Sequence, residues 1–208
     1  MLTISSPAML TLGFVLGLRH ALDADHVAAV STIVSERRSV LGSAVVGAVW
    51  GLGHTAALLA VAVLMIGLRV RMPASLARGF ELAVAAMLVA LGMNLLLRGP
   101  ARATRRRSNR RPFVVGLLHG LAGSAALMLA VLATIPSAPV AFAYVGTFGL
   151  GSVGGMMAMS AVLGVPVVVV AEHFRRAEQW LQTCAALGSV AVGVALAWEV
   201  GTRTGIPL

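Results

Sequence analysis

Six long apolar stretches run through this sequence, and they constrain its fold more than any other feature. Each is long enough, at about 17 residues or more, for a helix to cross the hydrocarbon core of a bilayer. The stretches are Pro7–Val34, Val40–Val70, Phe80–Leu97, Phe113–Thr134, Val140–Ala171 and Leu181–Val200. Only 11% of the 208 residues are charged, against about 25% in a soluble domain. We therefore expect an all-α integral membrane protein with about six transmembrane helices, forming a single membrane domain over residues 1–208.

The formal net charge of +9 comes mainly from arginines in the short connections between these stretches. Such a distribution is typical of residues that fix the orientation of a membrane protein, so we expect no nucleic-acid partner. The single cysteine, Cys184, excludes an internal disulfide.

The arginines are divided unequally between the two sides of the membrane. Eleven of them follow the first, third and fifth stretches, and four lie in the other connections or near the carboxyl end. The larger group is Arg37, Arg38, Arg98, Arg102, Arg105, Arg106, Arg107, Arg110, Arg111, Arg175 and Arg176. Because positive loops stay inside, we expect a cytoplasmic, arginine-rich loop at residues 98–111 and both termini outside the cytoplasmic membrane.

The two halves of the sequence resemble each other. "FVLGLRHAL" at residues 14–22 aligns with "FVVGLLHGL" at 113–121, and "WGLGHTAA" at 50–57 aligns with "FGLGSVGG" at 148–155. The offsets, 99 and 98 residues, are nearly constant. Residues 1–98 and 112–208 would each hold three spans, and an odd number inverts the second copy. We therefore predict two inverted three-helix repeats, the plan of many secondary transporters.

A cluster of ionisable residues interrupts the first two apolar stretches. Ionisable groups at such depth are costly and usually face a bundle interior or a wet cavity. Imidazole and carboxylate together suit divalent transition metals, and the lack of a thiolate disfavours Cu(I). We therefore predict a metal site, with these candidate ligands: His20, Asp23, Asp25, His26 and His54.

The spacing of His20 and His26 restricts how they share an ion. Six residues of straight helix separate them by about 9 Å of rise and about 120° of rotation, whereas a bound nitrogen lies about 2.0–2.1 Å from its ion. The helix must therefore bend or unwind near Leu22–Asp25, or else the two histidines act at successive positions along a path. On the helical wheel Asp23 can share a face with both, while Asp25 is the better candidate for orienting an imidazole.

Four further residues are candidates for a supporting role or for a permeation path. His119 is the repeat partner of His20, and it would act as a weak ligand, a gate or a packing residue. Thr55 has a simpler interpretation, a hydrogen bond to its own helix. The full set is Arg19, Thr55, His119 and Ser124.

At "RHALDADH", residues 19–26, the sequence closely resembles the R-H-A-x-D-A-D-H signature of the nickel/cobalt transporter family, NiCoT, within the NicO group. The G-H-T of residues 53–55 is similar to the family's second motif, G-H-S/T. Six spans, and a second half without the acid- and threonine-rich motifs, look more like the short urease-accessory nickel permease branch. The resemblance implies that the following residues recognise Ni(II) or Co(II): His20, Asp25, His26 and His54.

These observations favour a secondary transporter that moves Ni(II) or Co(II) across the cytoplasmic membrane. No G-x-x-x-x-G-K-S/T nucleotide motif occurs, so transport would be secondary or would use a separate partner. We expect neither an enzyme nor a prosthetic cofactor. The expected partners are the metal ion and the lipid bilayer, and a homo-oligomer is compatible with the sequence. The alternatives are an intramembrane metal-dependent hydrolase and a divalent-metal exporter.

Overall fold

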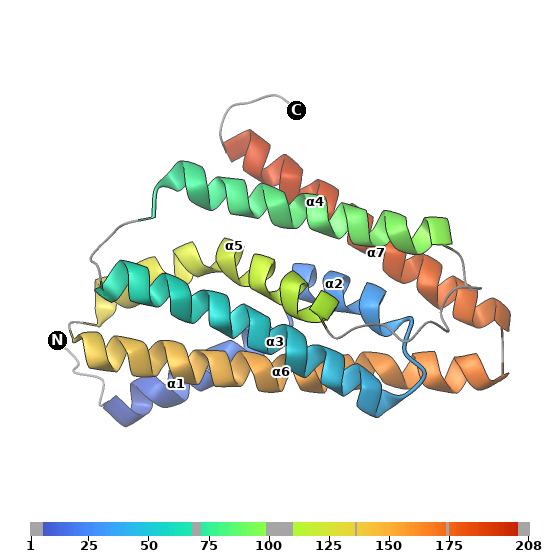
Figure 1. Cartoon of the computed structure of the whole chain (residues 1–208), viewed down its shortest axis with the longest axis horizontal. Helices are drawn as coiled ribbons and strands as arrows, with labels where there is room; N and C mark the ends of the chain where they lie inside the picture. The colour runs from blue at the N-terminus through green and yellow to red at the C-terminus, as the bar shows by residue number, and fades with distance from the viewer. Residues whose placement is uncertain (1–5, 68–71, 99–109, 136, 174, 204–208) are drawn as a thin grey trace.

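The chain forms a bundle of helices in a computed structural model that describes the backbone of residues 6–67, 72–98, 110–135, 137–173 and 175–203. Every regular element in these ranges is helical (Figure 1). The elements are α1 (Ser6–His20), α2 (Ala24–Val34), α3 (Val40–Ala62), the short π-helix η1 (Val63–Gly67), α4 (Ala74–Arg98), α5 (Arg110–Thr134), α6 (Ala138–His173) and α7 (Arg175–Arg203).

The expected all-helical class is confirmed, and each predicted apolar stretch coincides with helix. The first stretch divides into α1 and α2, so the described chain has seven α-helices where about six were expected. Four segments are long and apolar enough to cross a membrane. They are Val40–Gly67, Ala74–Leu97, Ala138–Val170 and Arg176–Arg203. The arginine-rich loop falls largely on residues 99–109, which lie outside the described ranges.

The division between α1 and α2 lies within the region where the histidine spacing requires a bend. The backbone N–H groups of Leu22 and Asp23 bond back three residues, to the carbonyls of Arg19 (2.9 Å) and His20 (3.1 Å), and these bonds close the last turn of α1. Asp23 then adopts an extended conformation (φ −61°, ψ 146°) and α2 begins at Ala24. The predicted interruption of the first span is therefore confirmed.

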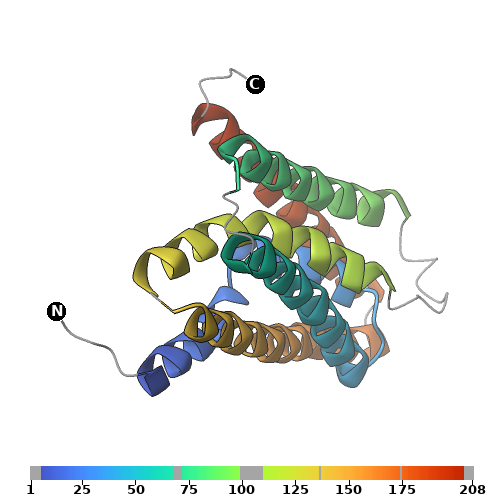
Figure 2. The ribbon, with the colours of Figure 1, turned by 60° about the vertical axis from the view of Figure 1, so that its left-hand side comes forward.

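The helices pack in three main pairs around a centre formed by α3 and α6. Helix α1 lies along α6, α5 lies along α3, and α4 pairs with α7 on one side of the bundle (Figures 1 and 2). Trp50 of α3 and Met156 of α6, 1% and 0% exposed, lie in the same buried cluster as Ala29 and Val30 of α2. Helix α2 therefore lies in the interior, where it packs mainly against α7 and also contacts α6, α4 and α3.

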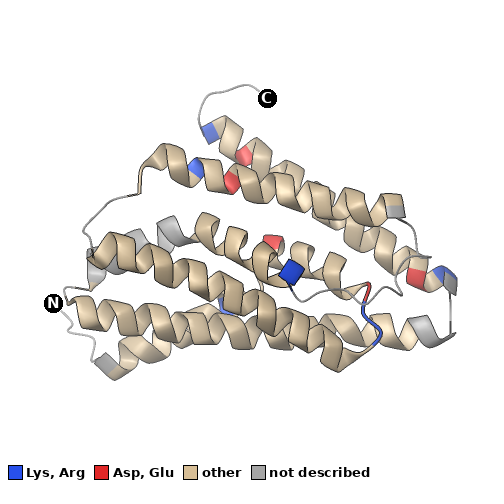
Figure 3. Ribbon diagram, in the orientation of Figure 1, with Lys and Arg blue, Asp and Glu red and all other residues tan. Residues whose placement is uncertain are grey.

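The outer surface of the bundle is apolar. Leu150 and Val162 of α6 are 67% and 69% exposed, and α3 and the described side chains of α6 carry no charge (Figure 3). A lipid-facing surface explains large exposed apolar side chains that water would disfavour.

The helices from α3 onward alternate in direction along the bundle. Figure 1 shows that α4 and α6 end, and α3 and α7 begin, toward the right-hand side of the view.

Candidate metal centre

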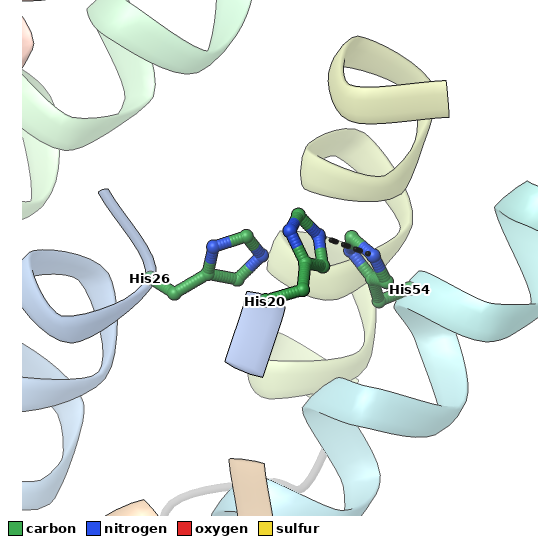
Figure 4. Close-up of side chains that lie close together, drawn as sticks. All are labelled: His20, His26 and His54. Carbon is green, nitrogen blue, oxygen red and sulfur yellow. Dashed lines mark hydrogen bonds between the residues drawn. The ribbon is translucent and has the colours of Figure 1, made fainter. Parts of the chain in front are cut away.

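Three histidines from three helices meet where α1 ends. His20 is the last residue of α1, His26 lies in the first turns of α2 and His54 lies within α3 (Figure 4). The interruption at Ala21–Asp23 separates the two helices that carry His20 and His26, and the ring centroids of these residues are 4.4 Å apart. We name His20, His26 and His54 the histidine trio.

The distances within the trio fit a single transition-metal ion. The Nε2 atoms of His20 and His54 are 3.3 Å apart. Two nitrogens that bind one tetrahedral ion, each at about 2.0–2.1 Å, lie about 3.3–3.4 Å from each other. One ligand atom from each residue of the trio lies within 4.8 Å of the others, which makes the three residues candidate ligands of one ion.

Two of these imidazoles are each oriented by a carboxylate of their own. The Nδ1 atom of His20 lies 2.9 Å from Oδ2 of Asp23, and the Nδ1 atom of His26 lies 3.1 Å from Oδ1 of Asp25. An imidazole that donates its Nδ1–H to a carboxylate keeps a lone pair on Nε2 for a metal. Because its carboxylate contacts His20, Asp23 does not cap α2 with its side chain, although it is the N-cap residue.

Two residues of the trio are buried, and the third, His20, lines a cavity. His26 and His54 are 1% and 0% exposed, and Nε2 of His26 and Nδ1 of His54 find no hydrogen-bond partner among the described residues. Buried polar atoms without partners cost free energy, which a bound ion would recover at Nε2 of His26. A cavity of about 410 Å³ is lined by residues that include Arg19, His20 and Asp23, so an ion has access to the outer side of the trio.

The supporting candidates have different environments. Arg19 is exposed and lines the cavity. The hydroxyl of Thr55 donates to the carbonyl of Gly149 in α6 at 3.2 Å, and this bond differs from the simpler alternative of a bond to its own helix. Gly149 allows this bond because a Cβ there would collide with the Thr55 side chain. Ser124 lies in a stretch of α5 whose side chains are outside the described part of the structure.

His119 of α5 joins the cluster from the second half of the chain. It is 2% exposed, and its Nε2 lies 2.8 Å from Oδ2 of Asp25. Asp25 therefore contacts two imidazoles, one on each carboxylate oxygen. The repeat alignment identified His119 as the partner of His20 but gave no reason for it to meet Asp25.

Two aromatic residues that the sequence analysis did not select pack against these rings. The ring of Phe148 lies 5.4 Å from that of His20, and the ring of Trp50 lies 5.2 Å from that of His26, measured between centroids. Trp50 and Phe148 occupy corresponding positions in the aligned segments of the two halves. This correspondence is the signal by which the sequence could have identified them. Their rings form apolar surfaces beside the histidines of the site.

A bundle of apolar helices with imidazoles and carboxylates gathered in its interior defines a membrane transport protein for a divalent transition metal. Residues 7–158 match the family model of NicO, the high-affinity nickel-transport proteins. The chain belongs to this family. It is therefore a nickel transporter, and the alternative of an intramembrane hydrolase is wrong.

Two curated relatives extend the comparison. The urease accessory protein UreH of Bacillus sp. (strain TB-90) is 31% identical over 218 residues, which cover 96% of this chain and 94% of that protein. The chloroplast protein FOR GROWTH AND FERTILITY 2 of Arabidopsis thaliana is 25% identical over 209 residues, and the match covers 88% of this chain and 54% of that protein. No solved structure matches the chain.

Proposed function

We propose that this chain is a secondary permease that imports Ni(II), and also Co(II), across the cytoplasmic membrane through the histidine trio. The single observation that carries this proposal is the 3.3 Å approach of the Nε2 atoms of His20 and His54, beside an imidazole nitrogen of His26 that has no described partner. Borderline imidazole ligands suit Ni(II) and Co(II). Asp23 and Asp25 hold the rings in position and supply negative charge beside the cation.

Import is the favoured direction because the ion is a dication. A membrane potential that is negative inside favours entry by about 2.3 kcal/mol per charge for every 100 mV. No nucleotide-binding motif supplies another source of energy in this sequence. Export remains the second candidate, since the same ligands serve either direction.

Reciprocal contacts between the halves support the proposal that residues 1–98 and 112–208 are inverted repeats. A Cβ on Gly17 of α1 would collide with the carbonyl of Phe148 in α6, and a Cβ on Gly116 of α5 would collide with the carbonyl of Trp50 in α3. Gly116 and Trp50 are the aligned partners of Gly17 and Phe148. The same contact thus occurs twice with the halves exchanged, as a two-fold relation between repeats requires.

Radioactive nickel uptake into proteoliposomes tests the proposal. We expect uptake that increases with an inside-negative potassium diffusion potential and falls to background in His20→Ala and His26→Ala. Uptake that neither substitution changes would contradict the assignment of the trio. Loss of preloaded nickel under the same potential, without uptake, would favour the exporter.

A further inference from the structure

A fourth imidazole lies next to the histidine trio without belonging to it. His119 is 2% exposed, and its Nδ1 finds no hydrogen-bond partner among the described residues. Its ring centroid is 6.4 Å from that of His54 but only 4.3 Å from that of His26. Burying a histidine whose second nitrogen has no partner costs free energy, so the position of His119 requires an explanation that the trio does not give.

Asp25, His26 and His119 form a second group with the geometry of a metal site. One ligand atom from each lies within 4.8 Å of the other two. The carboxylate stands between the rings, with Oδ1 3.1 Å from Nδ1 of His26 and Oδ2 2.8 Å from Nε2 of His119. A mixed set of imidazole and carboxylate ligands suits the same divalent ions as the trio.

His26 belongs to both groups. Its ring centroid lies 4.4 Å from that of His20 and 4.3 Å from that of His119. Its Nδ1 contacts Asp25, while Nε2 is the nitrogen without a described partner, and Figure 4 shows the imidazole directed toward His20. An ion on Nε2 of His26 is therefore held by the same ring whose Nδ1 faces Asp25, so its transfer to the second group moves it from one nitrogen of this ring to the other, with the ring proton moving in the opposite direction.

The two groups differ in their access to the cavity. His20 and Asp23 line it, whereas Asp25, His26 and His119 are not among its lining residues. An ion that enters from the cavity meets His20 and Asp23 first, and His26 adjoins both His20 and His119. This arrangement gives the two groups a sequence, from the cavity toward the second half of the chain.

We propose that Asp25, His26 and His119 form a second binding station for the transported divalent cation, which receives the ion from the histidine trio by ligand exchange at His26. This inference rests on the proposed permease function. Because His119 lies in α5, the second station combines residues from both halves of the chain. The first half then captures the ion, and the second half contributes a ligand for the next step of its passage.

Binding of Co(II), followed by its visible absorption in the purified full chain, tests whether the second station exists. In the double variant His20→Gln/His54→Gln the trio is dismantled, and we expect one Co(II) to bind about 10–100-fold more weakly than in the unaltered chain. Adding His119→Gln should abolish this residual binding. The proposal is overturned if the double variant binds no Co(II), or if the triple variant binds as well as the double.

Radioactive nickel flux tests whether the ion passes through the station. In His119→Gln the amide still donates to Asp25, so that position keeps its hydrogen bond but loses its imidazole ligand. We expect the affinity for the first Co(II) to stay within about threefold and the rate of nickel uptake to fall at least about tenfold. Leu118→Ala, at the neighbouring position of α5 that is 37% exposed, is the matched control and should transport normally.

The outcomes separate this inference from the function on which it rests. Unchanged uptake in His119→Gln, or an equal loss of affinity and uptake, overturns the second station while the permease function stands. If the unaltered chain neither binds nor takes up nickel, the permease function fails. Gel filtration of each variant establishes that the chain is folded before either measurement is interpreted.

Discussion

His20 and His54, 34 residues apart in the chain, place their Nε2 atoms 3.3 Å from each other. His20 is the last residue of α1 and His54 lies inside α3, so this contact joins the point where one helix stops to the middle of another. The contact brings a candidate metal ligand from each of the first two apolar stretches into one interior site. It also explains why α1 must end where it does, since a helix that continued would carry His26 away.

Replacing His54 tests this relationship directly. In His54→Gln the trio loses one of its three nitrogens, and we expect the affinity for Ni(II) to fall about tenfold. Isothermal titration calorimetry of the purified chain measures the change. Ser189→Ala is the control, because Ser189 is equally buried but donates to the carbonyl of Leu88 in the α4–α7 pair. An equal loss of affinity in both variants would point to misfolding and not to lost coordination.

Asp25 should matter more than Asp23, although both contact a histidine. A carboxylate accepts hydrogen bonds on both oxygens, and Asp25 uses one for His26 and the other for His119. In Asp25→Asn only one oxygen accepts, so one ring loses its orienting partner. We expect nickel affinity to fall about 10–100-fold.

Asp23→Asn is the matched comparison for that substitution. Asp23 contacts His20 alone and its side chain is 55% exposed, so water replaces the lost acceptor. We expect a loss of less than about tenfold, since orienting partners of metal ligands contribute about 10–100-fold when they are not replaced. Calorimetric titrations of the two variants side by side decide the point, and an equal effect would contradict the different roles assigned to the two carboxylates.

The sequence was sufficient to predict the helices and the interruption of the first one. Long apolar runs leave few alternatives in a membrane, because only helices or closed barrels satisfy their backbone groups there. The break at Ala21–Asp23 followed from coordination geometry, since His20 and His26 cannot reach one ion on a straight helix. Both inferences depend on local spacing, which a sequence states directly.

The contact between His119 and Asp25 could not be predicted in the same way. It joins residues 94 positions apart and depends on how α5 packs along α3. Helical periodicity describes one segment at a time and says nothing about which faces meet. The bond from Thr55 to Gly149 is a further case, because only the close approach of α3 and α6 places another helix's carbonyl nearer than its own.

Close packing of α1 on α6 should be sensitive to one methyl group. A Cβ on Gly151 of α6 would collide with the backbone carbonyl of Phe14 in α1, and we expect Gly151→Ala to destabilise the fold by about 1–3 kcal/mol. A Cβ on Gly146 of the same helix meets nothing within 4 Å, so Gly146→Ala should be neutral or stabilising by up to about 1 kcal/mol. Thermal unfolding in detergent, followed by loss of monodispersity, compares the two. Equal midpoints would contradict the packing of α1 against α6.

The choice of ligands predicts which ions compete with nickel. Imidazole nitrogen binds borderline transition metals well, whereas Mg²⁺ prefers oxygen ligands and keeps most of its water. The trio offers three imidazoles within 4.8 Å of one another, and its carboxylates are engaged in orienting the rings. We therefore expect Co(II) at a tenfold excess over nickel to reduce radioactive nickel uptake by about half or more, and Mg²⁺ in the same excess to leave uptake unchanged.

The control is a potassium salt at equal ionic strength, which separates specific competition from screening. Strong competition by Mg²⁺ would show that oxygen atoms dominate the coordination, and the assignment of His20, His26 and His54 as the capturing ligands would then fail.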